Sequence, residues 1–460
     1  MKRSGLTVAA AFLIIFVSYS AWMTGGTFAF SECKPWPNYN MLAKSFAKGQ
    51  LNLEEKIKED AVLFEGRSYM YAGPVPALFR MPFAALFNSG IPSGMMVALF
   101  CAGIAVVFIL TLPLLTDADQ QSTARPIQWL FSAIMVVNGI TLFITAIPSF
   151  HHEAIASGMF FLSSSIFIFL RIKSRSFRTT WAEAALFALS CSLCLGSRLS
   201  YALSIALLVC LFVVGLFRQL ESGKKLDAII PFGVFAAIVI AACGLLLIYN
   251  YQRFGSFLET GMRYQASQFF GHYFEGGNYF RYEHLPYNLW TFFCRLPEFI
   301  PQFPFYSLPL YTVEVSSYQF QPYHLIYKNE LSISMFLLMP LLGLMWFPIA
   351  NRFFSHERFP MGNYALLFSI FLLQIIPVSL TVATTARYYY DFLPVVLALA
   401  YLGALQLRKY GPISLPLTFL LGFLSIVFSL TLPIHGVEFY RQLISYESAL
   451  RSILLRVLSQ

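Results

Sequence analysis

Long apolar stretches separated by short polar segments run through most of the chain. The apolar stretches of spanning length, each near the ~20 residues that a membrane helix needs, cover residues 6–22, 92–115, 127–148, 154–171, 181–196, 199–217, 228–249, 330–350, 361–382, 391–407 and 413–433. This pattern predicts an all-α polytopic membrane protein with about 11 transmembrane helices. The stretch at 181–196 is short for a span, so its limits are soft.

Basic residues between these stretches predict how the chain is threaded. Lys2 and Arg3 precede the first stretch, which places the N-terminus in the cytoplasm. A cleaved signal peptide is the competing interpretation, but no small-x-small cleavage site follows, so an uncleaved anchor is favoured. The other basic clusters then fall on the same side; they are Arg171 to Arg178, Arg218 to Lys225, Arg352 with Arg358, and Arg408 with Lys409.

Two large segments, 24–90 and 250–329, are left on the outer side. Within the first, 71–88 holds Arg80 and several prolines, and if it crossed the membrane every later basic loop would move outside. We therefore expect it to be a re-entrant or interfacial segment. We expect residues 1–433 to form one transmembrane domain with two outer (periplasmic) loops, and 434–460 to form an amphipathic helix on the outer surface.

Composition supports a membrane protein and excludes a nucleic-acid partner. The chain is 58% hydrophobic and 12% charged, about half the charge of a soluble domain, which is roughly 25%. The net charge of +9 lies in short loops, so it reflects topology and membrane lipids rather than a binding face. Of seven cysteines, only Cys33 and Cys294 lie outside the spans. They can pair in an oxidising compartment, or be two unrelated thiols.

Polar residues concentrate in the outer segments and at the outer helix ends. In the first outer segment, Tyr39 and Asn40 open an amphipathic stretch, and turn signals at Gly66 and Gly73 bring Asp60, Arg67 and Tyr69 toward one rim. A carboxylate there can act as a general base on a hydroxyl. A solvated acidic loop is the alternative explanation of the same residues.

A second polar group is His151, His152 and Glu153 at a helix mouth. Histidine and glutamate can bind a divalent metal, but neighbouring residues on a helix point apart, which argues against a metal site. A glutamate near a helix N-terminus also favours the helix dipole. We predict no metal ligand here, but a substrate-binding role for His152 and a polar role for Glu153 facing the first outer segment.

A third polar group carries arginines. Arg387 and Tyr388 lie at the mouth of a late span, Arg198 lies at another mouth, and Arg253 opens the aromatic-rich second outer segment. The planar guanidinium suits a phosphate. Simpler explanations are an ion pair between Arg387 and Asp391, four residues apart, and interfacial anchoring of the lone arginines and aromatics.

These features together resemble the GT-C glycosyltransferases, polytopic enzymes that take a sugar from a polyprenyl-phosphate carrier and include mannosyltransferases and aminoarabinose transferases. The stretches that resemble an uncharacterised bacterial sub-group are YNMLAKSFAKGQL, DAVLFEGRSYMYAGPVPALFRMP, EAI at Glu153–Ile155, YNYQRFGSFLETGMRYQ and RYYYDFLP. The resemblance covers most of the chain and implies the bacterial cytoplasmic (inner) membrane. It departs at one place, because Pro35 and Trp36 stand where the family has an acid before the tyrosine that Tyr39 matches.

The resemblance implies a GT-C-like bundle and an enzyme that transfers sugar to a lipid or glycan acceptor at the outer face, with inversion. Arg387, with Arg198, would hold the carrier phosphate, and Asp60, with Glu153 and then Glu32 as substitutes, would act as base. No cofactor is implied beyond the polyprenyl-phosphate sugar donor. Two alternatives stay open: a transporter or flippase of lipid-linked sugars, which predicts polar residues inside spans, and a scaffold protein without catalysis.

Overall fold

The computed structural model describes residues 2–30, 38–54, 61–86, 90–116, 120–146, 149–221, 225–266, 279–299, 301, 306–307, 325–326, 332–354 and 361–435. Helices dominate these residues, as the apolar pattern predicts. They are α1 (Lys2–Thr24), α2 (Asn38–Ala47), α3 (Val75–Leu86), α4 (Ser93–Thr111), α5 (Gln121–Val137), α6 (Gly139–Ala146), α7 (Phe150–Ser174), α8 (Trp181–Ser197), α9 (Ala202–Glu221), α10 (Lys225–Phe254), α12 (Leu285–Phe293), α13 (Met335–Leu338), α14 (Phe347–Phe354), α15 (Met361–Ser379), α16 (Leu393–Leu407) and α17 (Ser414–His435).

Short 3₁₀ helices and strands complete the described chain. The 3₁₀ helices are η2 (Leu112–Leu115), η4 (Leu199–Tyr201), η5 (Met262–Tyr264), η6 (Tyr282–His284), η7 (Pro340–Trp346), η8 (Ala386–Asp391) and η9 (Arg408–Tyr410). The strands are β1 (Ala61–Phe64), β2 (Arg67–Tyr69), β3 (Gln265–Ala266), β4 (Glu298–Phe299), β5 (Tyr306–Ser307), β6 (Leu325–Ile326) and β7 (Ala383–Thr384).

Seven helical stretches in the described part of the chain are long and apolar enough to cross a membrane. They are Gly5–Thr24, Ser93–Leu115, Gln121–Ala146, Phe150–Ser174, Leu199–Leu220, Ala228–Phe254 and Met361–Ser379, and Trp181–Ser197 and Ser414–Leu430 are shorter apolar helices. The chain is therefore a multi-pass membrane protein, although the exact count of eleven is not confirmed. The expected span at 330–350 is the clearest difference, because it breaks into α13, η7 and the first residues of α14.

Breaks in the helices have local causes. Asn138 separates α5 from α6, and its side chain compensates for the lost helical bonds by donating to the carbonyls of Ile134 and Met135 and accepting from the Thr141 amide. Pro340 at the start of η7 cannot continue an α-helix, because it lacks an amide hydrogen. α3 is a 12-residue helix, too short to span at 1.5 Å per residue, which fits an interfacial segment.

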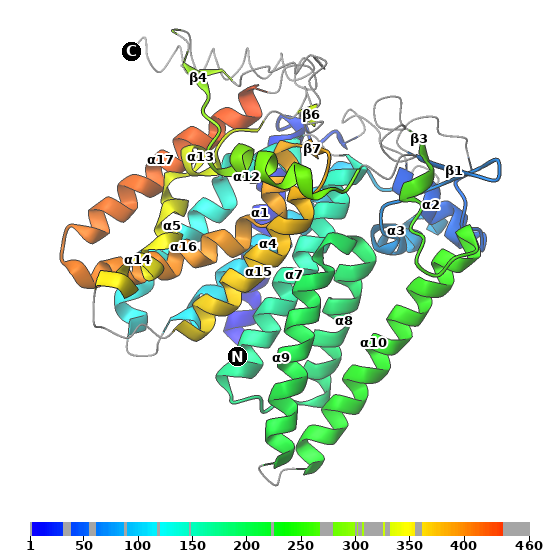
Figure 1. Ribbon diagram of the computed structural model, residues 1–460, viewed down its shortest axis with the longest axis horizontal. Helices are drawn as coiled ribbons and strands as arrows, with labels where there is room; N and C mark the ends of the chain where they lie inside the picture. The colour runs from blue at the N-terminus through cyan, green and yellow to red at the C-terminus, as the bar shows by residue number, and fades with distance from the viewer. Residues whose placement is uncertain are drawn as a thin grey trace.

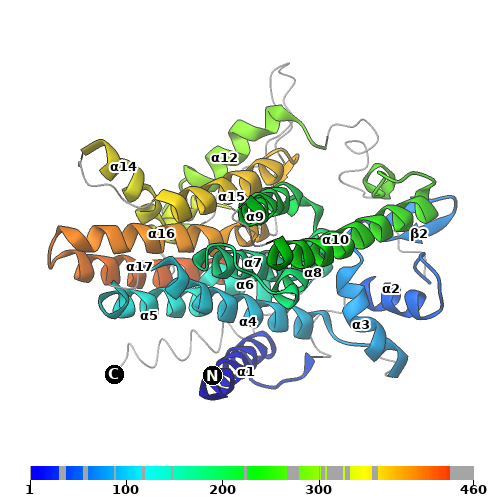
Figure 2. The ribbon, with the colours of Figure 1, turned by 90° about the horizontal axis from the view of Figure 1, so that it is seen from below.

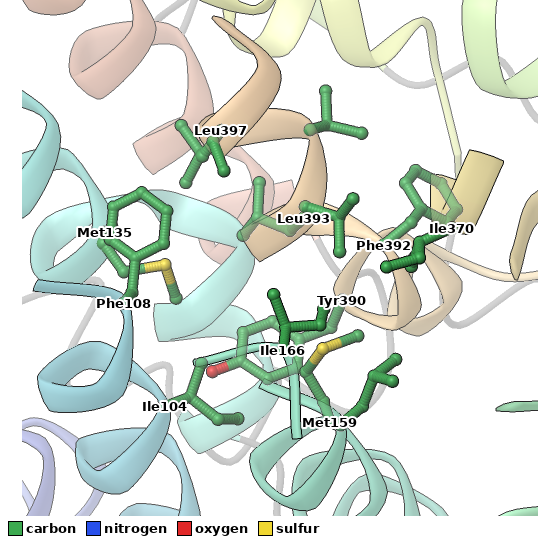
Figure 3. Packing of buried hydrophobic residues seen from close by; sticks show 14 of the residues in the cluster. Ile104, Phe108, Met135, Met159, Ile166, Ile370, Tyr390, Phe392, Leu393 and Leu397 are labelled. Atoms are coloured by element: carbon green, nitrogen blue, oxygen red, sulfur yellow. The ribbon is translucent and has the colours of Figure 1, made fainter. Parts of the chain in front are cut away.

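The apolar core lies where α4, α5, α7, α15, η8 and α16 meet. Figure 3 shows Phe108 of α4, Met135 of α5, Met159 of α7 and Leu393 of α16 packed in this core. Tyr390 of η8 is fully buried within it. α1 packs on α4 at one edge of the bundle (Figure 2).

The bundle has two chemically different ends. At one end lie α2, α3, α12 and strands β1, β3, β6 and β7, in the upper part of Figure 1, whereas α1 begins toward the other end. At that other end Lys173, near the C-terminus of α7, donates to Asn363 near the start of α15, and Arg175 pairs with Glu183 of α8. The basic α7–α8 connection therefore lies at this end, where α9 ends and α10 begins as well (Figure 1).

Main-chain hydrogen bonds join the two outer segments at the first end, which we call the site end. β1 pairs with β2 and also with β3, so the hairpin at 61–69 is tied to the chain that follows α10. β6 pairs in parallel with β7. The proposed bases Asp60 and Glu32, Cys33, and the tail from 436 lie outside the described residues. Cys294 is an exposed free cysteine.

Candidate functional site

Arg80 and Glu153 form a buried ion pair between α3 and α7. Arg80 Nε donates to Glu153 Oε1 at 2.9 Å and Nη2 donates to Oε2 at 2.5 Å, and both side chains are 0% exposed. The remaining donors of Arg80 bind Asn40 Oδ1, the Ile91 carbonyl and Ser93 Oγ. All donors of the guanidinium are thus used, and Arg80 occupies both oxygens of Glu153.

Asn40 links this pair to the rest of the first outer segment. Its Oδ1 accepts from Arg80 and from the Ile91 amide, while its Nδ2 donates to the Ile91 carbonyl at 2.9 Å. Gly90 has a φ of +70°, and a Cβ there would lie 2.7 Å from the Asn40 side chain. Asn40 therefore fastens α2 to the chain that enters α4, which is a structural task.

Tyr39 is a buried tyrosine of α2 that feels the charges of Glu153, Arg80 and Arg198. Its side chain is 0% exposed, and its hydroxyl has no hydrogen-bond partner among the described residues. Burial raises the pKa of Tyr39 well above its usual value and Glu153 raises it further, while Arg80 and Arg198 act in the opposite direction. The phenol therefore stays protonated and remains able to donate a hydrogen bond.

Arg198 and Asp391 form the second ion pair, at the mouths of α8 and α16. Arg198 Nη2 donates to Asp391 Oδ2 at 2.8 Å, and Tyr201 Oη donates to Asp391 Oδ1 at 2.5 Å. Asp391 is 0% exposed, whereas 20% of the Arg198 side chain is exposed. The buried Arg198 Nε has no hydrogen-bond partner in the part of the chain that the structure describes.

Tyr388 holds two arginines on its ring. The guanidinium carbons of Arg198 and Arg387 lie 5.7 Å and 5.8 Å from the ring centroid, within the ~6 Å range of cation–π contacts. Asp391, which the i,i+4 spacing assigns to Arg387, is bonded instead to Arg198, which lies 193 residues earlier in the chain. Two positive charges therefore lie close to one aromatic ring at the site end.

Glycines let the surrounding elements approach this ion pair. A Cβ on Gly73 would lie 2.1 Å from the Gly196 carbonyl oxygen and 2.7 Å from that of Ser197, so the first outer segment packs directly on the end of α8. A Cβ on Gly158 would lie 3.1 Å from Arg198 Cβ. The position of Arg198 is thus set by close contacts with α7 and with the first outer segment.

Asn288 of α12 supports the segment that leads to Arg387. It is 0% exposed. Its Nδ2 donates to the carbonyls of Ser379 and Thr381 at 2.8 Å and 2.7 Å, and its Oδ1 accepts from Thr384 Oγ1 at 2.7 Å. The second outer segment therefore fixes the chain between α15 and η8.

The other predicted site residues are more dispersed. Arg67 is exposed on β2, and Tyr69 is buried against Phe254, with ring centroids 5.4 Å apart. Arg253 donates to the Met70 carbonyl at 2.7 Å and lies over the Tyr249 ring, so it ties α10 to the first outer segment. His152 is buried with its ring against Phe143. Among the described residues, no group of three or more His, Cys, Asp or Glu is arranged to hold a metal ion.

Three residues of the site were not among the sequence candidates. Arg80 had a usable signal, because a lone charge within an apolar segment needs a partner. Asn288 also stands out as the polar residue of the apolar stretch LPYNLWTFF. Tyr201 carried no signal, since its role depends on a carboxylate 190 residues away.

The two ion pairs differ in the chemistry that they allow. Glu153 is enclosed and both its oxygens accept from Arg80, so it is poorly placed to take a proton from a substrate. Arg198 is partly exposed and keeps a buried donor without a partner, and Arg387 lies across the same tyrosine ring. This arrangement is suited to binding an anion such as a phosphate.

No protein-family model matches the chain, and no curated protein matches its sequence. Its fold is similar to that of the oligosaccharyltransferase AglB from Archaeoglobus fulgidus, solved in complex with an inhibitory peptide and a dolichol-phosphate, with a TM-score of 0.50 and 12% identity. The match covers 94% of this chain and 56% of AglB. The apo form of the Archaeoglobus fulgidus oligosaccharyltransferase gives a TM-score of 0.48 at 11% identity, over 93% of this chain and 56% of that one.

The likeness to AglB shows the fold. The chain therefore has a helical bundle similar to that of an archaeal oligosaccharyltransferase, which agrees with the GT-C-like bundle that the sequence resemblance implies. It spans little more than half of AglB's length, 56%.

Proposed function

We propose that the protein is a membrane glycosyltransferase that moves a sugar from a polyprenyl-phosphate carrier to a lipid or glycan acceptor at the outer face of a bacterial inner membrane. The observation that carries the proposal is the pair of arginines on Tyr388, at the end where both outer segments meet. The GT-C-like fold agrees with it, since AglB was solved with a dolichol-phosphate, a lipid of the proposed donor's chemical class.

The proposed reaction is a single displacement with inversion. The acceptor hydroxyl attacks the anomeric carbon, a new carbon–oxygen bond forms, and the bond to the phosphate oxygen breaks with its electron pair leaving on the phosphate. Arg387 and Arg198 offset the charge that develops on this leaving group. The hydroxyl proton goes to a carboxylate, for which Asp60 is our candidate.

Transfer of radiolabelled sugar tests this proposal. Membranes with wild-type protein, Asp60→Asn or Arg387→Ala are incubated with polyprenyl-phosphate sugar donors at equal expression, and sugar in the acceptor fraction is counted. We expect transfer by the wild type only. Arg67→Ala removes an exposed arginine of β2 and tests whether the loss of any outer arginine reduces sugar transfer equally. Relocation of the lipid-linked sugar across the membrane without transfer would favour a flippase instead.

A further inference from the structure

The second ion pair contains a buried carboxylate whose use is not explained by the proposed reaction. Asp391 accepts from Arg198 through one oxygen and from Tyr201 through the other, and its backbone carbonyl accepts from Gln374 Nε2 at 2.8 Å. A carboxylate that is fully buried and held by three separate elements has little freedom to move. Any group bonded to it is held equally firmly.

Arg198 is the group that this carboxylate holds. It follows α8 with an extended backbone, φ −155° and ψ 113°, so the helix does not fix the direction of its long side chain. Asp391 binds Nη2, and the Tyr388 ring lies beside the guanidinium. The buried Nε lacks a partner among the described residues, and a buried donor without a partner is costly unless a ligand or water uses it.

We propose that Asp391 and Tyr201 are positioning residues, which orient Arg198 so that its remaining donors bind a phosphate oxygen of the lipid carrier. The contrast with Arg80 supports this, because the donors of Arg80 are all used inside the protein. Tyr201 fixes Asp391, Asp391 fixes Arg198, and only Arg198 contacts the ligand. This inference rests on the proposed function for the identity of the ligand, but its test does not require sugar transfer.

Binding of undecaprenyl phosphate to the purified, detergent-solubilised protein tests it. We expect Asp391→Asn to raise the Kd by about tenfold, because it removes the charge that holds Arg198, and Tyr201→Phe to raise it by about threefold, because it removes the hydrogen bond that fixes Asp391. In an Arg198→Ala background, adding Asp391→Asn should change the Kd by less than about twofold, since both act through one group. Glu183→Gln, at the opposite end of α8, is the matched control and should bind like the wild type.

Several results would overturn the inference. One is a wild-type Kd in Tyr201→Phe, which keeps the ion pair and so decides the question even where Asp391→Asn fails to fold. Another is equal weakening by Asp391→Asn with and without Arg198, and a third is a wild-type protein that does not bind undecaprenyl phosphate. Binding with the expected variant pattern but without sugar transfer would remove the proposed function and leave this inference standing.

Discussion

Arg80 and Glu153 illustrate how a single buried pair can be confused with a catalytic one. A glutamate at a helix mouth beside the outer segments has the features of a general base, and the resemblance offers Glu153 after Asp60 for that role. In the structure its two oxygens bind Arg80 and it has no exposed surface. Breaking such a pair leaves an uncompensated charge in the interior, which is far more costly than losing an exposed pair.

We expect Glu153→Ala to lower the free energy of unfolding by about 3–5 kcal/mol, because Arg80 is left buried without an anion. Denaturant unfolding of the solubilised protein, followed by tryptophan fluorescence, measures this. Glu54→Ala, which removes the exposed pair with Lys48, should leave the unfolding curve unchanged. A Glu153→Ala protein as stable as the wild type but unable to transfer sugar would return Glu153 to the catalytic candidates.

The sequence could predict which kinds of residue matter at the site, but not their partners. Arginines at helix mouths and Tyr39 in the first outer segment were identifiable from residue type and place. The bonds that define their roles join residues 73 positions apart for Arg80 and Glu153 and 193 apart for Arg198 and Asp391. Local spacing even suggested the wrong partner for Asp391, because an i,i+4 ion pair competes with a contact between helices.

At the scale of elements, the close contact between the first outer segment and α8 is open to test. We expect Gly73→Ala to lower the free energy of unfolding by about 1–3 kcal/mol, because the new Cβ would meet the backbone carbonyls of Gly196 and Ser197. Gly73→Ala should also weaken the binding of undecaprenyl phosphate, because Arg198 directly follows Ser197 in the chain. Gly233→Ala in α10, where a Cβ meets nothing within 4 Å, is the control; equal behaviour of the two variants would contradict the packing.

Asn288 offers a second test at this scale. We expect Asn288→Ala to reduce sugar transfer, because the segment 379–384 loses three hydrogen bonds that hold it before Arg387. The unfolding free energy should fall by about 1–3 kcal/mol, as unpaired buried groups remain. Asn363→Ala, which removes the partner of Lys173 at the far end of the bundle, should leave transfer unchanged. Normal transfer by Asn288→Ala would show that α12 does not support the site.

Apolar stretches predicted most helices, because the length of an apolar stretch can be counted directly from the sequence. The interruptions were harder to predict. Asn138 ends α5 where Gly139 approaches α17 so closely that a Cβ would lie 1.6 Å from the Ser429 carbonyl oxygen, and such an approach depends on the packed helices. The pairing of β1 with β3 could not be predicted either, since a strand of two residues, the length of β3, has no sequence pattern of its own.

At the scale of the whole molecule, the separation of the two ends follows from the distribution of charge. The basic residues Arg171, Lys173 and Arg175 lie at one end of the bundle, and the two ion pairs of the site lie at the other, where the outer segments meet. Basic loops stay on the cytoplasmic side of a membrane. The site end is therefore expected to face outward, where a lipid-linked sugar and its acceptor would meet.

Cysteine labelling can test this orientation with two matched substitutions. Ser256 follows α10 at the site end and Ser174 ends α7 at the basic end, and both are exposed. In a background with Cys33 and Cys294 replaced by serine, we expect a membrane-impermeant maleimide to label Ser256→Cys in intact cells. Ser174→Cys should be labelled only after permeabilisation, and the parent should stay unlabelled. The reverse pattern would place the site in the cytoplasm and exclude transfer at the outer face, whereas labelling of both from one side would contradict the two-ended bundle.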